Sequence, residues 1–464
     1  ALYSGRAVYY PTVWHGALAL APGGPVPVST AGALTLTTVA WPLSLLGLLA
    51  RVTGLDAACE PEAEGAGRRQ RVCAVAAVLA LSAGVVGFPM LLTTSLTVWP
   101  YTLSVLGLPG VLVLYDLLRR GTDSRRPHLA RILLTLAAAG GVVAAHGTGL
   151  FNLAVLTLPF LVDAAASLWR RSTGSRGGRA LLTTGAVAVV LALGTGAWLM
   201  RGSLASVLGY QRPAGGVASA AATLGQALID LPMYGAVPGA TVPIGIVIGL
   251  LTLAAAWSAH ARREHRPWLV MWMLVLLLLV LVGGPQWAGR QLGSPWYLQK
   301  ARILPLAILP ALILVAQAGA GQPGQRLWAT LRRTASRVGG ARPGRTTTAM
   351  LVALVLLPVA ARVPLERNLV ASVYDPQRIQ YGTLLTEDAM RLIQRSRGTL
   401  PDDAVVLGAP SRGATYWWSL GGVHVVYPTR AGADEDTPED ALASVWPTLG
   451  QEGSEVCTLL NRLG

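Results

Sequence analysis

Residues Ser294-Pro-Trp-Tyr-Leu-Gln-Lys-Ala-Arg302 lie between two long apolar runs, Trp268–Gly283 and Ile303–Ala318. Both runs predict helices in a hydrocarbon environment. The stretch between them holds Lys300, the only lysine of the chain, beside a Trp-Tyr pair of the kind that anchors at a membrane surface. Two interpretations follow. The cations hold a phosphate at the mouth of an apolar helix, or they only extend toward the interface beside belt aromatics.

The composition places the whole chain in the same class. Of its 464 residues, 53% are apolar and 13% are charged. That charged fraction is roughly half of what a soluble domain carries. The net charge of +15 does not indicate nucleic-acid binding, because most arginines lie in short loops between apolar runs. The excess of arginine over lysine, with abundant alanine and glycine, is typical of a GC-rich, actinobacterial genome. Three cysteines show no metal-ligand spacing and predict no disulfide framework.

Ten spanning segments are expected, after a short helix over Gly16–Ala21 that lies at the membrane surface. Several are shorter than about 20 residues, so their edges extend or they pack inside a bundle. The segments are Thr30–Ala50, Val72–Phe88, Leu96–Leu118, Ile132–Ala145, Leu150–Trp169, Ala180–Met200, Thr241–Ala259, Trp268–Gly283, Ile303–Ala318 and Thr348–Ala361.

The loops between these segments predict the topology. Loops 51–71, 119–131, 170–179, 260–267 and 319–347 hold 22 arginines, whereas the alternate loops hold five basic residues. The arginine-rich set is therefore expected in the cytoplasm of a multi-pass plasma-membrane protein. Loop 319–347 is interpreted as a solvated linker, and loops 201–240 and 284–302 are expected outside.

The composition changes after residue 361, and the tail is expected on the external side. A helix over Gly382–Gly398, a strand over Ala404–Leu407, a helix over Ser411–Leu420, a strand over His424–Tyr427 and a helix starting at Thr437 suggest a small α/β domain. The expected organisation is the end of a first external loop over residues 1–28, a helical bundle over 29–361 and an external domain over 362–464. Both ends are expected to be cropped from a longer protein.

Polar residues expected on the external face are the candidates for chemistry, because polar groups at membrane depth are costly. Each also has a structural interpretation: His146 as the cap of a tight turn, and Asp230 as a solvated charge at a helix end. Asp116 and Asp163, beside arginines, are interpreted as structural. The candidates are His15, His146, Asn152, Asp230, Tyr297, Lys300 and Arg302.

This pattern suggests chemistry on a lipid-linked substrate. A polyprenyl-phosphate sugar would place its phosphate at the headgroup level, where Lys300 and Arg302 would stabilise the departing charge. A carboxylate would take the proton of the acceptor hydroxyl. The rings of Tyr10, Trp14, Trp417 and Trp418 suit sugar faces, and they equally suit an interface belt.

Three stretches resemble the GT-C superfamily of multi-spanning glycosyltransferases, and most closely an actinobacterial, largely uncharacterised group. Tyr10-Pro-Thr-Val-Trp-His15 resembles the Y-P-x-x-W-H that closes the first large external loop. Pro295-Trp-Tyr297, followed by Arg302, resembles a late W-Y-x-D-x-x-R loop. Leu407-Gly-Ala-Pro-Ser-Arg-Gly413 and Gly422-Val-His-Val-Val-Tyr-Pro428 resemble the G-x-P-x-x-G and the strand of the external tail.

The resemblance implies a GT-C-like bundle and a set of site residues. It implies donor-phosphate binding by Arg302, Lys300, Tyr297 and His146, and a substrate loop of Tyr10, Trp14, His15, Asn152 and Trp296. Gln299 stands where the family pattern has an acid, so a carboxylate role at that loop is in doubt. The general base is expected upstream of residue 1, with Asp230 as the fallback. No cofactor is assigned, and a divalent metal is left open.

The expected function is transfer of a sugar from a polyprenyl phosphate to a glycan or protein of the cell envelope. One alternative is a transporter or flippase of lipid-linked intermediates, which predicts related halves and interrupted spans. No clear internal repeat is visible. Another alternative is a non-catalytic scaffold whose external domain binds an envelope partner.

Overall fold

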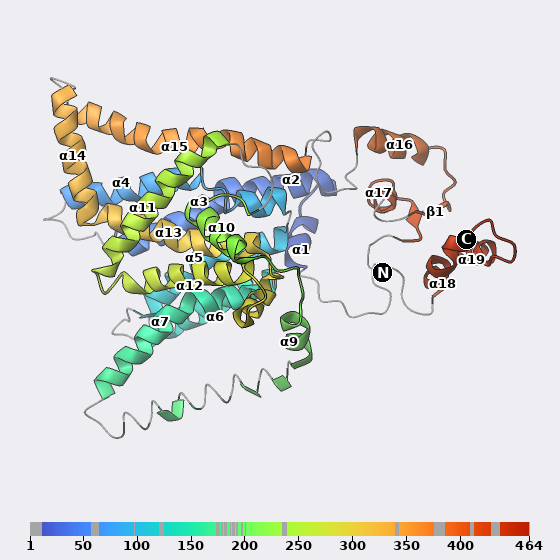
Figure 1. The fold of residues 1–464 in the computed structure, drawn as a ribbon, viewed down its shortest axis with the longest axis horizontal. Helices are drawn as coiled ribbons and strands as arrows, with labels where there is room; N and C mark the ends of the chain where they lie inside the picture. Colours follow the sequence, from blue (N-terminus) through green and yellow to red (C-terminus); the bar gives the residue numbers. More distant parts are fainter. Residues whose placement is uncertain are drawn as a thin grey trace. The chain divides into compact units, whose positions relative to one another are not determined.

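The computed structural model describes residues 12–56, 65–96, 98–119, 125–172, 201–233, 239–338, 343–374, 386–408, 413–427 and 437–463, with scattered positions between 177 and 199. The chain divides into two compact units (Figure 1). Pro11–Leu369 form a helical unit, and Val370–Gly464 belong to a second unit. The expected segment Ala180–Met200 lies mostly outside the described residues, as does Tyr10.

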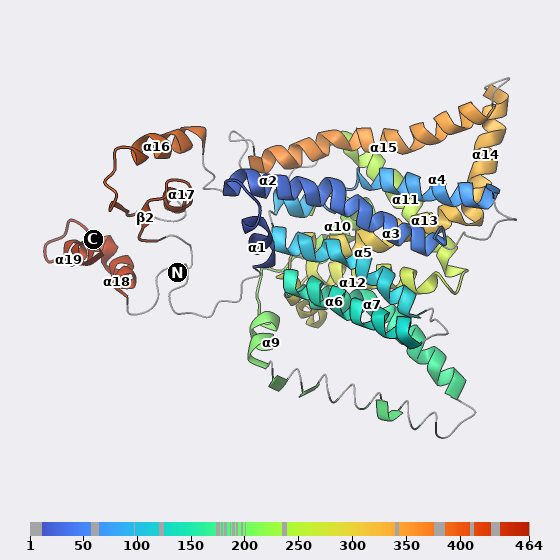
Figure 2. The ribbon, with the colours of Figure 1, turned by 180° about the vertical axis from the view of Figure 1, so that it is seen from behind.

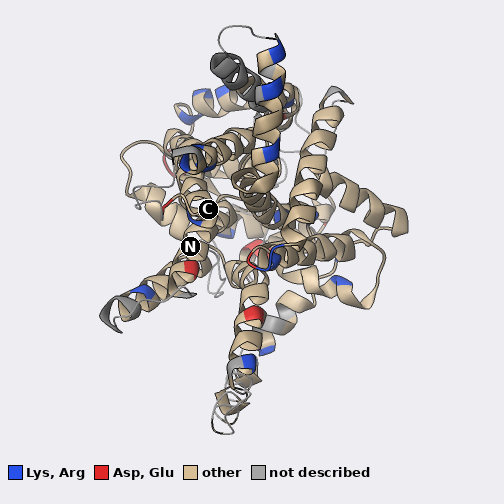
Figure 3. Cartoon of the chain, turned by 90° about the vertical axis from the view of Figure 1, so that its left-hand side faces the viewer, with Lys and Arg blue, Asp and Glu red and all other residues tan. Residues whose placement is uncertain are grey.

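Six helices in the described part of the chain are long and apolar enough to cross a membrane, and they coincide with six of the expected segments. The protein is therefore a multi-pass helical membrane protein. The first of these helices is continuous through α2 (Pro25–Thr35), the π-helical η1 (Leu36–Ala40) and α3 (Trp41–Thr53). The others are α5 (Trp99–Arg119), α7 (Gly149–Arg171), α11 (Val242–His260), α12 (Arg266–Gly283) and α13 (Lys300–Ala320). Each of the six has an 18-residue stretch with at most two charged residues, and Figure 3 shows how thinly acidic and basic residues are spread over the described chain.

Helix α13 is the centre of this unit. It packs against α3, α4 (Gly65–Ser82), α11 and α12, and Figures 1 and 2 show it among them from both sides. Its Ile303, Leu304 and Ile313 side chains are fully buried. A helix that is apolar all round is stable in this position because every face meets another apolar surface.

The expected span Val72–Phe88 is corrected by the structure, because α4 ends at Ser82. The chain from Ala83 to Phe88 is not helical, although its side chains are apolar. Gly87 lies so close to its neighbours that a Cβ there would be 2.9 Å from Ile308. Glycine thus allows an irregular backbone to enter the bundle, where other protein groups satisfy its N–H groups.

Two expected loops are helical instead. Loop 201–240 contains α9 (Arg201–Leu208) and α10 (Val217–Leu228), and α10 packs against α12 with Thr223 fully buried. Loop 319–347 contains α14 (Gln322–Val338), whose apolar and basic residues lie on different faces. Alanine-rich and arginine-rich stretches have high helix propensity, which a hydropathy criterion does not register.

Further elements complete the helical unit. Helix α1 (Val13–Ala19) overlaps the short helix expected over Gly16–Ala21 but begins and ends earlier, and α6 (Arg125–Ala145) packs against α5. The predicted structural role of Asp116 is supported, since its Oδ2 lies 2.7 Å from Arg51 Nε. The remaining elements are η2 (Leu91–Ser95), η4 (Gly239–Thr241), η5 (Ala288–Trp296) and α15 (Pro343–Tyr374).

The second unit has the expected order of helices and strands. The hydroxyl oxygens of Thr386 and Thr437 cap α16 (Glu387–Arg397) and α18 (Pro438–Val445) by accepting N–H bonds from Ala389 and Asp440. The strands are shorter than expected: β1 (Val405–Val406) and β2 (His424–Val425) form one parallel pair. Also present are α17 (Ala414–Ser419), η7 (Trp446–Thr448) and α19 (Val456–Leu463).

Candidate functional site: the Arg302 cluster

The turn before α13 places an arginine among aromatic rings. Tyr297 and Leu298 both adopt the left-handed backbone conformation, with φ of 57° and 49°. Consecutive non-glycine residues rarely do so, and such strain persists only where the surrounding structure holds it. The turn ends at Gln299, the N-cap of α13, and sets Tyr297 beside Arg302.

The Arg302 guanidinium is held from three sides. Its carbon lies 4.5 Å from the Tyr297 ring centroid and 5.8 Å from that of Tyr101. Its Nε donates to Gln299 Oε1 at 2.7 Å. The Tyr101 hydroxyl donates to the Arg302 carbonyl at 2.6 Å, and Tyr210 meets Tyr297 edge to face. We call Tyr101, His146, Tyr297, Gln299 and Arg302 the Arg302 cluster.

The cluster carries uncompensated positive charge. Among the described residues, no carboxylate lies within ion-pair distance of Arg302. The neighbouring charge is Arg212, which is exposed and has the same sign. A fixed guanidinium whose remaining N–H groups lack an acidic partner is suited to bind a phosphate or carboxylate ligand.

His146 lies in this cluster and also caps a turn, so both of its expected roles have a geometric basis. Its Nδ1 accepts the Thr148 N–H at 3.2 Å, and its ring meets the Tyr101 ring edge to face. Since Nδ1 accepts, a neutral His146 carries its proton on Nε2 and can donate from there. Burial, and then the charge of Arg302, lower the pKa of His146 to about 4.

We expect His146 to make the protein less stable in acid. Between its pKa of about 4 in the folded chain and the ordinary 6.5, the unfolded chain binds more protons, so the free energy of unfolding falls as the pH decreases. His146→Asn keeps an acceptor near the Nδ1 position and should reduce the loss seen in detergent-solubilised protein between about pH 7 and pH 5. The exposed His15 provides the control, His15→Asn. Equal acid sensitivity of the wild type and His146→Asn would contradict this pKa.

Asn152 and Trp296 are buried beside the cluster and hold its turn in place. Asn152 Oδ1 accepts the Trp296 indole N–H at 2.8 Å, and both side chains are buried. The Thr148 hydroxyl donates to the Pro295 carbonyl at 2.9 Å. These bonds join α7 to η5 and position the turn. The expected substrate-loop residues Asn152 and Trp296 are therefore both buried, and their hydrogen bond fixes the position of the turn.

The structure separates Lys300 from Arg302. Lys300 Nζ donates to the Thr223 hydroxyl of α10 at 3.2 Å, whereas Arg302 faces α5. Residues two positions apart in a helix differ by about 200° around its axis. The side chains of Lys300 and Arg302 therefore leave α13 on nearly opposite sides. The expectation that both cations hold one phosphate is thus not supported by this geometry.

Asp230 lies apart from both Lys300 and Arg302, and its hydrogen bonds link the Val86–Gly87 segment to Arg362 of α15. Its carboxylate accepts the N–H groups of Val86 at 2.7 Å and Gly87 at 2.9 Å. Arg362, which is fully buried, donates to the carbonyls of Asp230 and Ile229, both at 2.9 Å. Burial raises the pKa of the Asp230 carboxyl, against the opposing effects of Arg362 and the two N–H groups. At 1% exposure, this carboxylate is better suited to a structural role than to proton transfer.

The remaining expected site residues lie apart from Arg302 or outside the description. Trp14 is buried and stacks on Trp99 with ring centroids 5.7 Å apart, and His15 is exposed. Tyr10 falls in the part of the chain that is not described. Within the described residues, no three His, Cys, Asp or Glu side chains gather closely enough to hold a metal ion.

A family match spans residues 1–464. The chain belongs to DUF6541, a family of unknown function. No curated protein and no solved structure matches this DUF6541 chain. Its function therefore has to be inferred from its own residues. The sequence did not single out Tyr101, Tyr210 or Arg362, since an aromatic or basic residue within an apolar helix or a loop carries no local signal of a distant partner.

Proposed function

We propose that the protein transfers a sugar from a polyprenyl-phosphate donor to a glycan or protein of the cell envelope, on the external face of the plasma membrane. The observation that carries this proposal is the guanidinium of Arg302 at the N-terminal end of an apolar helix, where it has no acidic partner among the described residues. Gln299 accepts a hydrogen bond from Arg302 Nε and so orients the guanidinium. A carboxylate at position 299 would also neutralise the guanidinium charge, which the amide does not.

The proposed reaction breaks the bond between the sugar anomeric carbon and the phosphate oxygen. The acceptor oxygen forms the new bond to that carbon, and its proton passes to a general base that remains unassigned. Negative charge grows on the leaving polyprenyl phosphate, and Arg302 stabilises it. The Nε2–H of neutral His146 is a second donor to the phosphate. The Tyr297 ring packs on one face of the guanidinium, and the phosphate binds the N–H groups at its edge.

One observation favours transport of lipid-linked intermediates as a second candidate function. The chain between Ala83 and Phe88 interrupts the helical bundle and is held by Asp230. Interrupted helices within a bundle are typical of transporters. A transporter moves its substrate without changing it, so the products distinguish the two functions.

The test uses the full-length protein in liposomes with radiolabelled polyprenyl-phosphate sugars and a cell-envelope extract. We expect one label to pass to the extract and the lipid phosphate to be released. Movement of an intact donor across the bilayer without transfer would favour the transporter. If the protein neither transfers the label nor moves the donor, and binds no lipid phosphate, both proposed functions are contradicted.

A further inference from the structure

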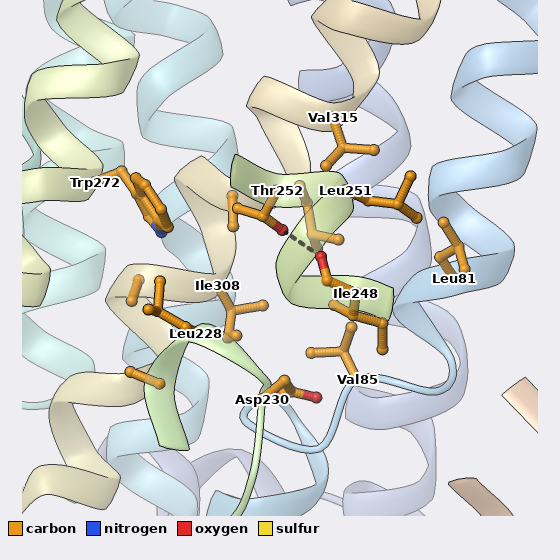
Figure 4. A pocket seen from close by; sticks show the side chains of 14 residues that line it. Leu81, Val85, Leu228, Asp230, Ile248, Leu251, Thr252, Trp272, Ile308 and Val315 are labelled. Carbon is orange, nitrogen blue, oxygen red and sulfur yellow. Dashed lines mark hydrogen bonds between the residues drawn. The ribbon is translucent and has the colours of Figure 1, made fainter. Parts of the chain in front are cut away.

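The interior of the helical unit leaves little room for a ligand beside α13. Figure 4 shows the cavity there, with Asp230 at one end and Val315 at the other. Its volume of about 40 Å³ admits a few water molecules and no lipid chain. The Thr252 hydroxyl on its wall already donates to the Ile248 carbonyl at 3.0 Å. The features that point to a further ligand lie instead on the surface of the bundle, on α14.

Helix α14 follows the membrane-spanning α13 after a tight turn. A Cβ on Gly324 would overlap the carbonyl oxygen of Gly319, so glycine permits this close approach. The Gln70 side chain of α4 donates to the carbonyls of Gly319 and Gly321, at 2.9 and 2.8 Å. As Figures 1 and 2 show, α14 crosses the end of the bundle instead of continuing α13. A helix that crosses the end of a spanning helix lies at the level of the lipid headgroups.

One side of α14 carries an exposed stripe of arginines. Arg326, Arg333 and Arg337 are separated by seven and four residues, a spacing that brings them onto one face of a helix. All three are exposed, and no carboxylate among the described residues lies within ion-pair distance of them. The side-chain hydrogen bonds of Arg333 stay within α14. Since Gln322–Val338 contain no acidic residue, α14 itself does not compensate the charge of this arginine stripe.

The opposite side of α14 is apolar. Leu327, Trp328 and Leu331 lie about 100° to 200° around the helix axis from Arg326. Trp328 and Leu331 are half-buried, and α14 packs against α13 and α4. Leu327 is 48% exposed, so its side chain is available to acyl chains. Basic residues opposite an apolar face are typical of a helix that lies between the headgroups and the acyl chains.

This end of the bundle is basic beyond α14 as well. Arg68 and Arg69 lie in the first turns of α4, and Arg262 follows α11 and lies beside Gly321. These residues belong to the arginine-rich loops for which the sequence predicts a cytoplasmic position. The cytoplasmic leaflet carries anionic lipids, which attract basic segments next to a spanning helix. Arg302 lies at the other end of α13, which is about 30 Å long.

We propose that α14 is a membrane-surface helix that binds anionic phospholipids through the arginine stripe. The guanidinium groups of Arg326, Arg333 and Arg337 contact headgroup phosphates, and Leu327 enters the acyl region beside them. The occupant is a lipid leaflet rather than a soluble anion, because the turn at Gly324 joins α14 to a spanning helix and keeps the stripe at headgroup level. The site lies at the opposite end of α13 from the Arg302 cluster and does not depend on the proposed transfer reaction.

The test is hydrogen–deuterium exchange of the full-length protein in nanodiscs of phosphatidylcholine, with or without phosphatidylglycerol. Lipids that bind α14 reduce its open population, so the peptide covering Gln322–Val338 should exchange more slowly with phosphatidylglycerol. At about fivefold for each arginine near an anionic surface, three arginines set a limit of roughly 100-fold on this difference. The triple variant R326Q/R333Q/R337Q should exchange at the same rate in both membranes. High salt should reduce the difference in the wild type, because salt screens exposed charges.

A matched control removes the same charge elsewhere. Arg391, Arg395 and Arg397 are exposed on α16, and their replacement with glutamine should leave the lipid dependence of α14 unchanged. Equal exchange of wild-type α14 in the two membranes, or a lipid dependence that survives in R326Q/R333Q/R337Q, would overturn the proposal. Inorganic phosphate that slows exchange in phosphatidylcholine nanodiscs as much as phosphatidylglycerol does would also overturn it, and would assign the arginine stripe to a soluble anion.

Discussion

Replacing Arg302 with alanine should reduce sugar transfer by about 100-fold or more, because removal of one preorganised donor to a developing oxyanion has effects of that size. The variant should still fold. Arg302 forms no ion pair among the described residues, and its side chain is held by one hydrogen bond and ring contacts. Transfer is measured with the radiolabelled donor in liposomes, and folding by thermal unfolding in detergent.

Two further variants separate charge from shape. Arg302→Lys keeps the charge but loses the planar contact with Tyr297 and the Nε bond to Gln299, so an intermediate rate is expected. Gln299→Glu adds a carboxylate beside the guanidinium and should weaken donor binding by neutralising it. Full activity of Arg302→Ala in correctly folded protein would remove Arg302 from the phosphate site.

The largest loss of stability is expected from Arg362→Leu. This change leaves the carbonyls of Ile229 and Asp230 without their donors in a fully buried place. Each orphaned buried acceptor costs about 1–3 kcal/mol, and the unpartnered Nε of Arg362 reduces the net loss somewhat. The segment that Asp230 holds, Val86–Gly87, should loosen with it.

Thermal unfolding in detergent measures this effect, with Arg367→Leu as the matched control. Arg367 lies on the same helix α15 and is exposed. Its replacement should change the unfolding midpoint little, since surface substitutions have small effects. A midpoint for Arg362→Leu equal to that of Arg367→Leu would show that the two carbonyls find other donors.

The sequence predicted the apolar helices well because length and hydropathy are local properties. It placed the start of α13 at Ile303, whereas the helix begins at Lys300. That difference decides the site: Lys300 and Arg302 in a loop can converge, but on a helix they diverge. The end of α4 was missed because glycine and the distant Asp230, rather than any polar interruption, break the helix.

The sequence predicted only some members of the Arg302 cluster, because only some of them are visible from local sequence properties. His146, Tyr297 and Arg302 stand out as polar or aromatic groups at expected helix ends, and the structure brings them together. Tyr101 completes the cluster from within an apolar helix, where hydropathy treats it as one more spanning residue. Contacts between residues distant in the chain depend on helix packing, which composition does not specify.

Because Lys300 is the only lysine, the chain offers one side-chain amine to acylating reagents. That amine donates to the Thr223 hydroxyl of α10. A ligand that covers it will protect a single position from modification, and intact-mass measurement will register the protected fraction directly. The wild-type protein thus carries its own reporter of ligand binding at the start of α13, with no engineered label.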